Sequence, residues 1–428
     1  RVARLIDDGT SPERILLLTF TRRAAAEMLR RAGGLIDHRA TGRVWGGTFH
    51  SIANRLLRGN AAAVGLDDGF TVLDQGDVAG LFGLLRAELG FAESKTRFPR
   101  KETIAAIYSR AVNAQQKLGR VLEERFPWCQ DHGDELREIF RGYTQRKRRH
   151  NVVDFDDLLL YWRALLESPA SGSVSGLFDH VLVDEYQDTN RIQADILRLL
   201  CGSGGNVTVV GDDAQSIYSF RAATVENITE FPEVFPGATV IKLEQNYRST
   251  PQILDVANAV ISEAEGGFPK RLWSERPPGP RPNLVTCVDE AAQAEHVCDR
   301  VLEMRELGVP LQDQAVLFRT GHHSDGLEIE LSRRKIPYAK FGGLKFLEAA
   351  HVKDLMATLR VLDNPRDELA WHRVLQLIPG IGPATARRIL TDLTDSNEAP
   401  LARFCEGGFT VVAEAKPLLI DLQEALQD

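Results

Sequence analysis

The sequence has few cysteines, and no two of them stand at the spacing of a metal-binding or redox motif. The five cysteines, at positions 129, 201, 287, 298 and 405, include no CxxC pair. This pattern argues against a zinc site and a disulfide framework. It is typical of the reduced thiols of a cytoplasmic protein. The sequence also lacks a signal peptide and any apolar run long enough to span a bilayer. We therefore expect no membrane partner.

An excess of positive charge is also absent. The chain carries 52 Lys and Arg against 60 Asp and Glu, a formal net charge of −8. A uniformly basic coat for nucleic acid is thus excluded, and any contact with nucleic acid must come from a local track. The apolar content of 43% and the charged content of 26% are those of an ordinary globular protein. A chain of 428 residues has room for about two to four domains.

Two adjacent acids follow a short apolar run in VLVDEYQDTN, residues 181–190. The Val-rich run predicts a buried parallel strand, which places Asp184 and Glu185 at its carboxyl edge. Open α/β sheets bind ligands at that edge. One acid of such a pair can hold Mg²⁺ while the other positions or deprotonates an attacking water in nucleotide hydrolysis. The alternative interpretation is a solvated strand end.

A second predicted strand, residues 206–210, leads into GDDAQSIYSFRAA, residues 211–223. Here Gln215 can contact a phosphate oxygen, while Tyr218, Phe220 and Arg221 can contact nucleic-acid bases and backbone. A third predicted strand, residues 238–243, ends in EQNYRST. It places an aromatic ring and an arginine suited to a transferring phosphoryl group, Tyr247 and Arg248, at the same edge.

These segments stand in the order found in UvrD/Rep/PcrA-type superfamily 1 DNA helicases, which the chain resembles over nearly its whole length. The resemblance begins with ILLLTFTRRAAAEM, residues 15–28, and GTFHSIANRLL, residues 47–57. It implies an α/β fold: a RecA-like P-loop NTPase motor domain with a helical insertion, and part of a second RecA-like domain. It also implies an ATP-dependent DNA helicase or translocase that moves 3′ to 5′ on single-stranded DNA and unwinds duplexes in DNA repair or replication.

The resemblance assigns roles to individual residues. For the cofactors ATP and Mg²⁺, Asp184 serves the metal, Glu185 the attacking water, Gln215 and Arg248 the γ-phosphate, and Tyr247 the adenine. The residues that line the single-stranded DNA track are Phe20, Thr21, Thr48, His50, Phe155, Tyr218, Phe220 and Arg221. The implied partners are single-stranded DNA, junctions of single- and double-stranded DNA, and repair or replication loading proteins.

Several of these residues also have plain structural interpretations. Phe20 and Thr21 are, on their own pattern, a core ring and a helix cap. A lone His such as His50 is usually a structural hydrogen-bonding residue, and the family interpretation makes it a DNA-backbone contact rather than an acid or base. Phe155 fits a buried position on an amphipathic helix equally well. The basic run RKRRH, residues 146–150, is either a solvated helix end or a phosphate-contacting face.

The pattern along the chain predicts four parts. We expect a split first motor domain at 1–50 and 178–250, a helical insertion at 51–177, the first part of a second motor domain at 251–371, and the start of its helical insertion at 372–428. Residues 74–166 show helical periodicity with no further buried strand. Strands at 282–288 and 314–318 with a helix at 291–307 predict a β-α-β unit. LIPGIGPATARRIL, residues 377–390, predicts two helices joined by a Gly-rich turn, which either offers amides to a phosphate or is a plain helical hairpin.

The chain departs from the family pattern in a few places. Phe220 stands where Trp is common, Ala214 replaces a common Asp, Tyr186 replaces a common Phe, and Ala349 stands where a basic residue is frequent. The sequence does not begin with Met, and neither the family's GxxxxGK[ST] loop nor its later motifs are present. We therefore expect a fragment that is itself inactive. Two competing functions are the helicase subunit of an AddAB/RecB-type helicase-nuclease, which sequence beyond Asp428 would reveal, and a non-hydrolysing DNA-binding scaffold.

Overall fold

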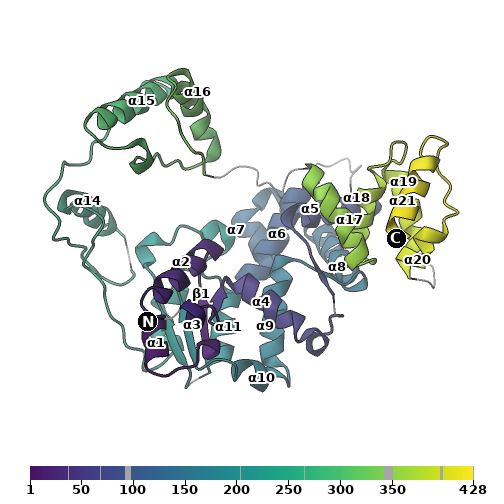
Figure 1. Cartoon of the computed structure of the whole chain (residues 1–428), viewed down its shortest axis with the longest axis horizontal. Coiled ribbons are helices and arrows are strands. Elements are labelled where there is room, and N and C mark those ends of the chain that lie inside the picture. Colours follow the sequence, from purple (N-terminus) through teal and green to yellow (C-terminus); the bar gives the residue numbers. More distant parts are fainter. Residues whose placement is uncertain are drawn as a thin grey trace. The chain divides into compact units, whose positions relative to one another are not determined.

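The structure of this protein, a computed structural model, describes residues 1–36, 38–67, 69–91, 98–202, 204–264, 266–341, 350–395 and 399–427. The chain forms two compact units (Figure 1). The first unit contains Arg1–Lys242, Glu265–Lys270 and Met356–Asp428, and the second contains Leu243–Ala264 and Arg271–Leu355. Each unit is described separately below.

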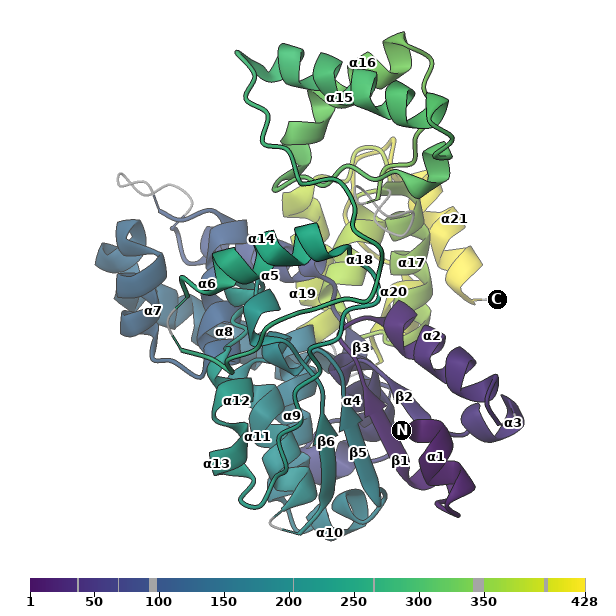
Figure 2. The same cartoon turned by 90° about the vertical axis from the view of Figure 1, so that its left-hand side faces the viewer.

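The first unit is built on a four-stranded parallel sheet (Figure 2). Its strand order is β2 (Trp45–Gly47), β1 (Ile15–Leu18), β5 (His180–Val183) and β6 (Asn206–Val209). All three neighbouring pairs are parallel. The carboxyl ends of the four strands therefore meet at one edge, as the sequence predicts for β5 and β6.

Alternate residues of the strands pack against different sets of helices. Leu16 and Val181 belong to a large core cluster with residues of α4 (Phe49–Arg58), α9 (Phe155–Glu167) and α11 (Arg191–Cys201). Leu17 and Leu182 instead join a smaller cluster with residues of α1 (Val2–Asp7) and α2 (Arg22–Gly33). Because successive side chains of a strand point to opposite faces, this division shows helices on both faces of the sheet. The α/β fold predicted from the sequence is confirmed.

The helical insertion surrounds a separate core. Its helices are α5 (Gln75–Glu88), α6 (Lys101–Ala114), α7 (Leu118–Arg125) and α8 (Gly133–Arg149). They enclose a cluster in which Phe82 stacks on Tyr143 with ring centroids 4.1 Å apart. The prediction that this stretch holds no buried strand was wrong, because β4 (Val152–Val153) is buried and pairs with β3 (Thr71–Val72). Two residues are too few to show the alternation by which a strand is recognised.

The last helices of the first unit form another core. They are α17 (Ala350–Asp363), whose residues from Met356 onward belong to this unit, α18 (Glu368–Leu375), α19 (Pro383–Asp395), α20 (Pro400–Glu406) and α21 (Lys416–Gln427). Trp371 and Phe404 are fully buried among them. The predicted helix, Gly-rich turn and helix are present, and Gly380 has a φ of +89°. A Cβ at Gly380 would lie 2.7 Å from Val412 Cγ2, so the turn also needs a residue without a side chain. The contact expected at Ala349 lies outside the described residues.

The second unit contains α14 (Pro251–Ile261), α15 (Glu290–Glu306) and α16 (Asp325–Arg333), of which α15 corresponds to the helix predicted at 291–307. The strands predicted at 282–288 and 314–318 are not formed, and neither is the strand predicted at 238–243. Leu284 and Leu317 are 94% and 93% exposed. A strand needs a neighbour that accepts and donates its backbone hydrogen bonds. No described residue pairs with these segments, so their β-branched composition alone does not make them strands.

No helix in the described part of the chain is both long and apolar enough to cross a membrane.

Candidate functional site at the sheet edge

Two carboxylates stand where β5 ends. The backbone N–H of Asp184 donates to Leu18 O at 2.9 Å, which extends the ladder between β1 and β5 by one residue. The next residue, Glu185, has a left-handed backbone with φ +52° and ψ +48°. Such a conformation is uncommon for a residue other than Gly and is found at functional turns. It reverses the chain, so that the exposed Glu185 side chain lies beside the half-buried Asp184.

Burial and the neighbouring charge of Glu185 raise the pKa of two carboxyl groups at this strand end. Burial, and then the neighbouring Glu185, raise the pKa of Asp184. The same two causes raise the pKa of Asp188, in the following 3₁₀ turn, to about 6. Local negative charge of this kind favours a bound cation. Within the described residues, no cluster of three or more His, Cys, Asp or Glu could hold a metal alone. A hard cation such as Mg²⁺ takes only one or two carboxylates in proteins and completes its shell with phosphate oxygens and water.

Gln187 connects Glu185 to the loop that follows β6. Its Nε2 donates to Glu185 Oε2 at 2.8 Å, and its Oε1 accepts from Asp212 N at 3.0 Å. The side chain is buried, so both ends of the amide are held. Gly211 permits this approach, since a Cβ there would lie 2.5 Å from Gln187 Oε1. The sequence analysis missed Gln187, although an amide two residues beyond the catalytic candidate was a usable signal.

Gln215 is held in the 3₁₀ turn Asp213–Gln215 after β6. Its Nε2 donates to Asp212 Oδ2 at 2.7 Å. Asp212 also accepts from Ala214 N at 3.1 Å and so caps the turn. The amide of Gln215 is exposed but oriented, because its nitrogen faces the carboxylate.

Phe20, Tyr218, Phe220 and Arg221 form one cluster, although they come from loops about two hundred residues apart in the chain. The ring centroids of Phe20 and Tyr218 are 4.6 Å apart, and those of Tyr218 and Phe220 are 5.7 Å apart. The Arg221 guanidinium lies between 5.6 and 6.0 Å from the three ring centroids. Phe220 is 64% exposed. The cluster thus offers open aromatic surface and a positive charge, the combination that binds single-stranded nucleic acid.

The predicted hydroxyl residues cap helices. Thr21 Oγ1 accepts from Ala24 N at 3.1 Å at the start of α2, and Thr48 Oγ1 accepts from Ser51 N at 3.3 Å at the start of α4. The structural interpretation of Thr21 is therefore confirmed, and a contact of either residue with DNA stays a prediction. Both caps place their helix N-termini at the sheet edge, where backbone N–H groups favour phosphate.

His50 and Phe155 meet in an edge-to-face contact with ring centroids 5.8 Å apart. Burial lowers the pKa of His50 to about 4, so the imidazole is neutral near pH 7. The role of His50 as a contact to the DNA backbone stays a prediction. Phe155 is 42% exposed, which contradicts the interpretation as a fully buried core ring.

Asn113, which the sequence analysis also missed, links this edge to the insertion. Its Oδ1 accepts from Asn190 Nδ2 at 2.7 Å, and its Nδ2 donates to Asp156 Oδ1 at 2.6 Å. Asn190 caps α11 directly after the VDEYQDT segment, and Asp156 lies next to Phe155 in the first turn of α9. The strand-end loop and the helix that presents Phe155 are thus joined by two hydrogen bonds through Asn113.

The Asp156 carboxyl gives a pH test of this linkage. Burial, and then the charge of Asp154, raise its pKa from 3.8 to about 7. A raised folded-state pKa contributes stability that is complete at low pH and is lost as the pH rises through about 7. We expect Asp156→Asn to unfold at a higher temperature than wild type above pH 7 and to show a smaller fall in melting temperature between about pH 4 and 7. Equal slopes for the two proteins would contradict this assignment.

The basic run at residues 146–150 is a solvated helix end only in part, because Arg148 and Arg149 are exposed whereas Lys147 and His150 are buried. The Lys147 side chain is 4% exposed, and its Nζ lies 2.6 Å from both Asp154 and Asp157. Arg146 pairs with Glu88 and Glu368. The Arg146 and Lys147 side chains are therefore engaged in ion pairs within the protein and are not presented to phosphate.

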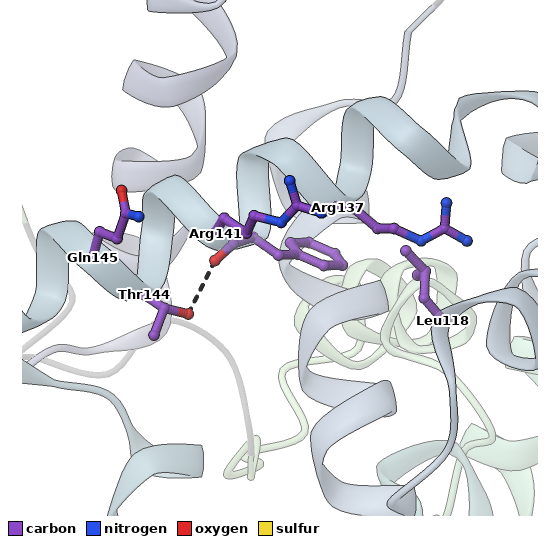
Figure 3. Close-up of a pocket in the computed structure, with 6 residues that line it drawn as sticks. Leu118, Arg137, Arg141, Thr144 and Gln145 are labelled. Atoms are coloured by element: carbon purple, nitrogen blue, oxygen red, sulfur yellow. Dashed lines mark hydrogen bonds between the residues drawn. The ribbon is translucent and has the colours of Figure 1, made fainter.

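A hollow elsewhere on the insertion holds none of the candidate residues. Its volume is about 470 Å³, and it lies against α8 (Figure 3). Its lining residues are Leu118, Arg137, Phe140, Arg141, Thr144 and Gln145. Thr144 Oγ1 donates to the Phe140 carbonyl at 3.0 Å, the bond drawn in Figure 3.

Tyr247 and Arg248 belong to the second unit and are described within it. Both side chains are exposed. Tyr247 Oη donates to Gln245 Oε1 at 2.7 Å, and Asn246 Oδ1 accepts from Arg248 N at 2.9 Å. The Asn246 side chain thereby fixes the turn that presents both residues. Their participation in the same site as Gln215 stays a prediction.

Comparisons with known proteins identify relatives of both halves of the chain. Residues 1–236 match the UvrD/REP helicase N-terminal domain, and residues 241–403 match the UvrD-like helicase C-terminal domain. The ATP-dependent DNA helicase PcrA of Staphylococcus epidermidis is 34% identical over 93% of this chain and 54% of its own length. DNA helicase II of Escherichia coli is 37% identical over 90% of this chain and 53% of its own length. The chain thus spans about half the length of the curated relatives it matches.

Proposed function

Since this chain belongs to the UvrD/Rep family of helicases, we propose that the protein is an ATP-dependent DNA helicase or translocase. It moves 3′ to 5′ on single-stranded DNA and couples ATP hydrolysis to duplex unwinding, in the cytoplasm, during DNA repair or replication. The observation that carries this proposal is the ring cluster of Phe20, Tyr218 and Phe220 beside Arg221. Its member Tyr218 follows the oriented Gln215 amide by three residues on the same loop. One loop then bears both phosphate-contacting and base-stacking groups.

The nucleotide side of the proposal assigns one task to each residue. Asp184 holds Mg²⁺, which neutralises the charge on the phosphates when bound. Glu185, oriented by Gln187, positions the attacking water and accepts its proton. Gln215 and Arg248 contact the γ-phosphate, and Tyr247 lies against the adenine. The proposed domains are a split first motor domain at 1–50 and 178–250, which includes Tyr247 and Arg248, a helical insertion at 51–177, the first part of a second motor domain at 251–371, and the start of its helical insertion at 372–428.

The nucleic-acid side of the proposal uses rings and helix starts. Bases of the single strand stack on Phe155 and on the ring cluster, and Arg221 adds positive charge. Thr21, Thr48 and His50 contact the backbone at the capped starts of α2 and α4. Junctions of single- and double-stranded DNA are the proposed substrates, and loading proteins of repair or replication are the proposed partners.

Replacing Phe220 by Ala tests the stacking role. We expect single-stranded DNA affinity in the full-length protein to fall by roughly 1–3 kcal/mol, with little dependence on base identity. Because the ring is 64% exposed, its removal leaves no cavity, and the melting temperature should not change. The slope of affinity against salt should also hold, since no phosphate contact is removed. Trp128→Ala, which removes a ring that is 70% exposed on the insertion, is the matched control. Equal losses in the two variants would rule out a stacking site at Phe220.

A further inference from the structure

A short segment of the chain, residues 266–270, packs on the first unit although its sequence neighbours on both sides belong to the second unit. We call these residues the strap. Phe268 packs against the core that supports the sheet, and Lys242 Nζ donates to Pro269 O at 2.6 Å. The backbone N–H of Phe268 donates to Asp213 Oδ2 at 3.2 Å. Gly267, with a φ of +81°, comes so close to Asp213 Oδ2 that a Cβ would collide with it. The strap is thus seated by several independent contacts on the loop that carries Gln215.

The strap ends in an ammonium group that pairs with both acids of this loop. Lys270 Nζ lies 2.8 Å from Asp213 Oδ1 and also pairs with Asp212 Oδ1. The Lys270 side chain is only 16% exposed. Burial alone would raise the pKa of Asp212, but its hydrogen bonds with Lys270 and Gln215 hold that pKa below its ordinary value. The carboxylate therefore stays charged and remains an acceptor.

The same carboxylate orients the candidate phosphate sensor. Asp212 accepts from Lys270 through Oδ1 and from Gln215 Nε2 through Oδ2. An amide nitrogen has two hydrogens, so the hydrogen of Gln215 Nε2 that does not face Asp212 is free for a phosphate oxygen. Lys270 also offsets two negative charges that would otherwise repel an incoming triphosphate.

We propose that Lys270 is a positioning residue for phosphate sensing, which acts through Asp212 on Gln215 and ties the sensor loop to the strap. The inference rests on the proposed role of Gln215 in ATP hydrolysis. It goes beyond that role because it makes the sensor's orientation depend on a segment whose two ends lead into the second unit. A movement that lifts the strap would release the carboxylate and the amide together.

Steady-state ATP hydrolysis by the full-length protein at saturating single-stranded DNA tests this inference. Lys270→Met should lower kcat/KM about 10- to 100-fold, the cost of a misplaced catalytic group. Lys270→Arg, which keeps the charge and the donors, should recover most of that loss. Asp213→Asn, which removes the other carboxylate of the pair and leaves the Asp212 to Gln215 bond, should change kcat/KM by about twofold or less.

The decisive comparison adds Lys270→Met to Gln215→Ala. If Lys270 acts through Gln215, the second change should cost about twofold or less in that background, because the group being positioned is gone. An equal loss in both backgrounds would overturn the inference in favour of a general structural role. If Gln215→Ala lowers kcat/KM and Lys270→Met does not, the inference is overturned and the proposed function of Gln215 is unaffected. No loss in Gln215→Ala would overturn the proposed function of Gln215 and the inference with it.

Discussion

Replacing Glu185 by Gln in the full-length protein should leave ATP binding intact and slow ATP hydrolysis about 10²- to 10⁴-fold, the usual contribution of a positioned general base. The amide keeps the shape of the side chain and can still meet Gln187, whose Nε2 donates to Glu185 Oε2 at 2.8 Å. It cannot accept the proton of the attacking water. Single-turnover hydrolysis and equilibrium ATP binding, measured on the same preparation, separate the chemical step from affinity.

Asp188→Asn is the matched control for this experiment. Asp188 lies three residues beyond Glu185 in the same turn, and burial raises the pKa of its carboxyl to about 6. The change removes a neighbouring negative charge without removing the proposed base. We expect hydrolysis to stay within about threefold of wild type, as for a group outside the reacting set. If both variants lose activity equally, local charge rather than a base at Glu185 is responsible.

Lys147→Met should be among the most destabilising single changes in the first unit. The Lys147 ammonium lies 2.6 Å from Asp154 and from Asp157, and it is almost wholly buried. Tyr143 Oη also donates to Asp154, at 2.7 Å. Removing the ammonium leaves two carboxylates buried without their cation. Breaking a buried pair in this way typically costs about 3–5 kcal/mol of unfolding free energy. Chemical denaturation at neutral pH measures it.

Arg141→Met is the control on the same helix, since Arg141 is exposed on α8 (Figure 3). Its unfolding free energy should change by no more than about 0.5 kcal/mol. A small loss for Lys147→Met as well would mean that the two carboxylates take up protons at little cost, and the buried ion pair would not be a stabilising element of the insertion.

The strands and their polar ends were predictable because the signal is local. The apolar runs at residues 15–18 and 181–183 are buried on both faces, and such runs stand out without any knowledge of the fold. The segment at 238–243 carries the same kind of residues, and yet it forms no strand. What differs is the presence of a pairing partner, which is a long-range property that composition does not contain.

The ring cluster was predictable from the parallel topology of the sheet. Parallel strands end at one edge, so Phe20 after β1 and Tyr218 after β6 are brought together. Two residues that orient the site, Asn113 and Lys270, were not predictable. They act through hydrogen bonds to partners as many as 77 residues away, and nothing in their local sequence marks them. The basic run failed as a signal because charge alone does not tell a buried Lys147 from a solvated one.

In the proposed function, one loop after β6 connects ATP hydrolysis to single-stranded DNA. The most direct test is the ATP hydrolysis rate of the full-length protein, measured against the concentration of single-stranded DNA for wild type and Phe220→Ala. We predict saturable stimulation by DNA, an unchanged DNA-free rate in the variant, and a half-saturating DNA concentration raised about 5- to 100-fold, the equivalent of a lost stacking contact. Stimulation with the same half-saturation in both proteins, or no stimulation in wild type, would contradict the claim.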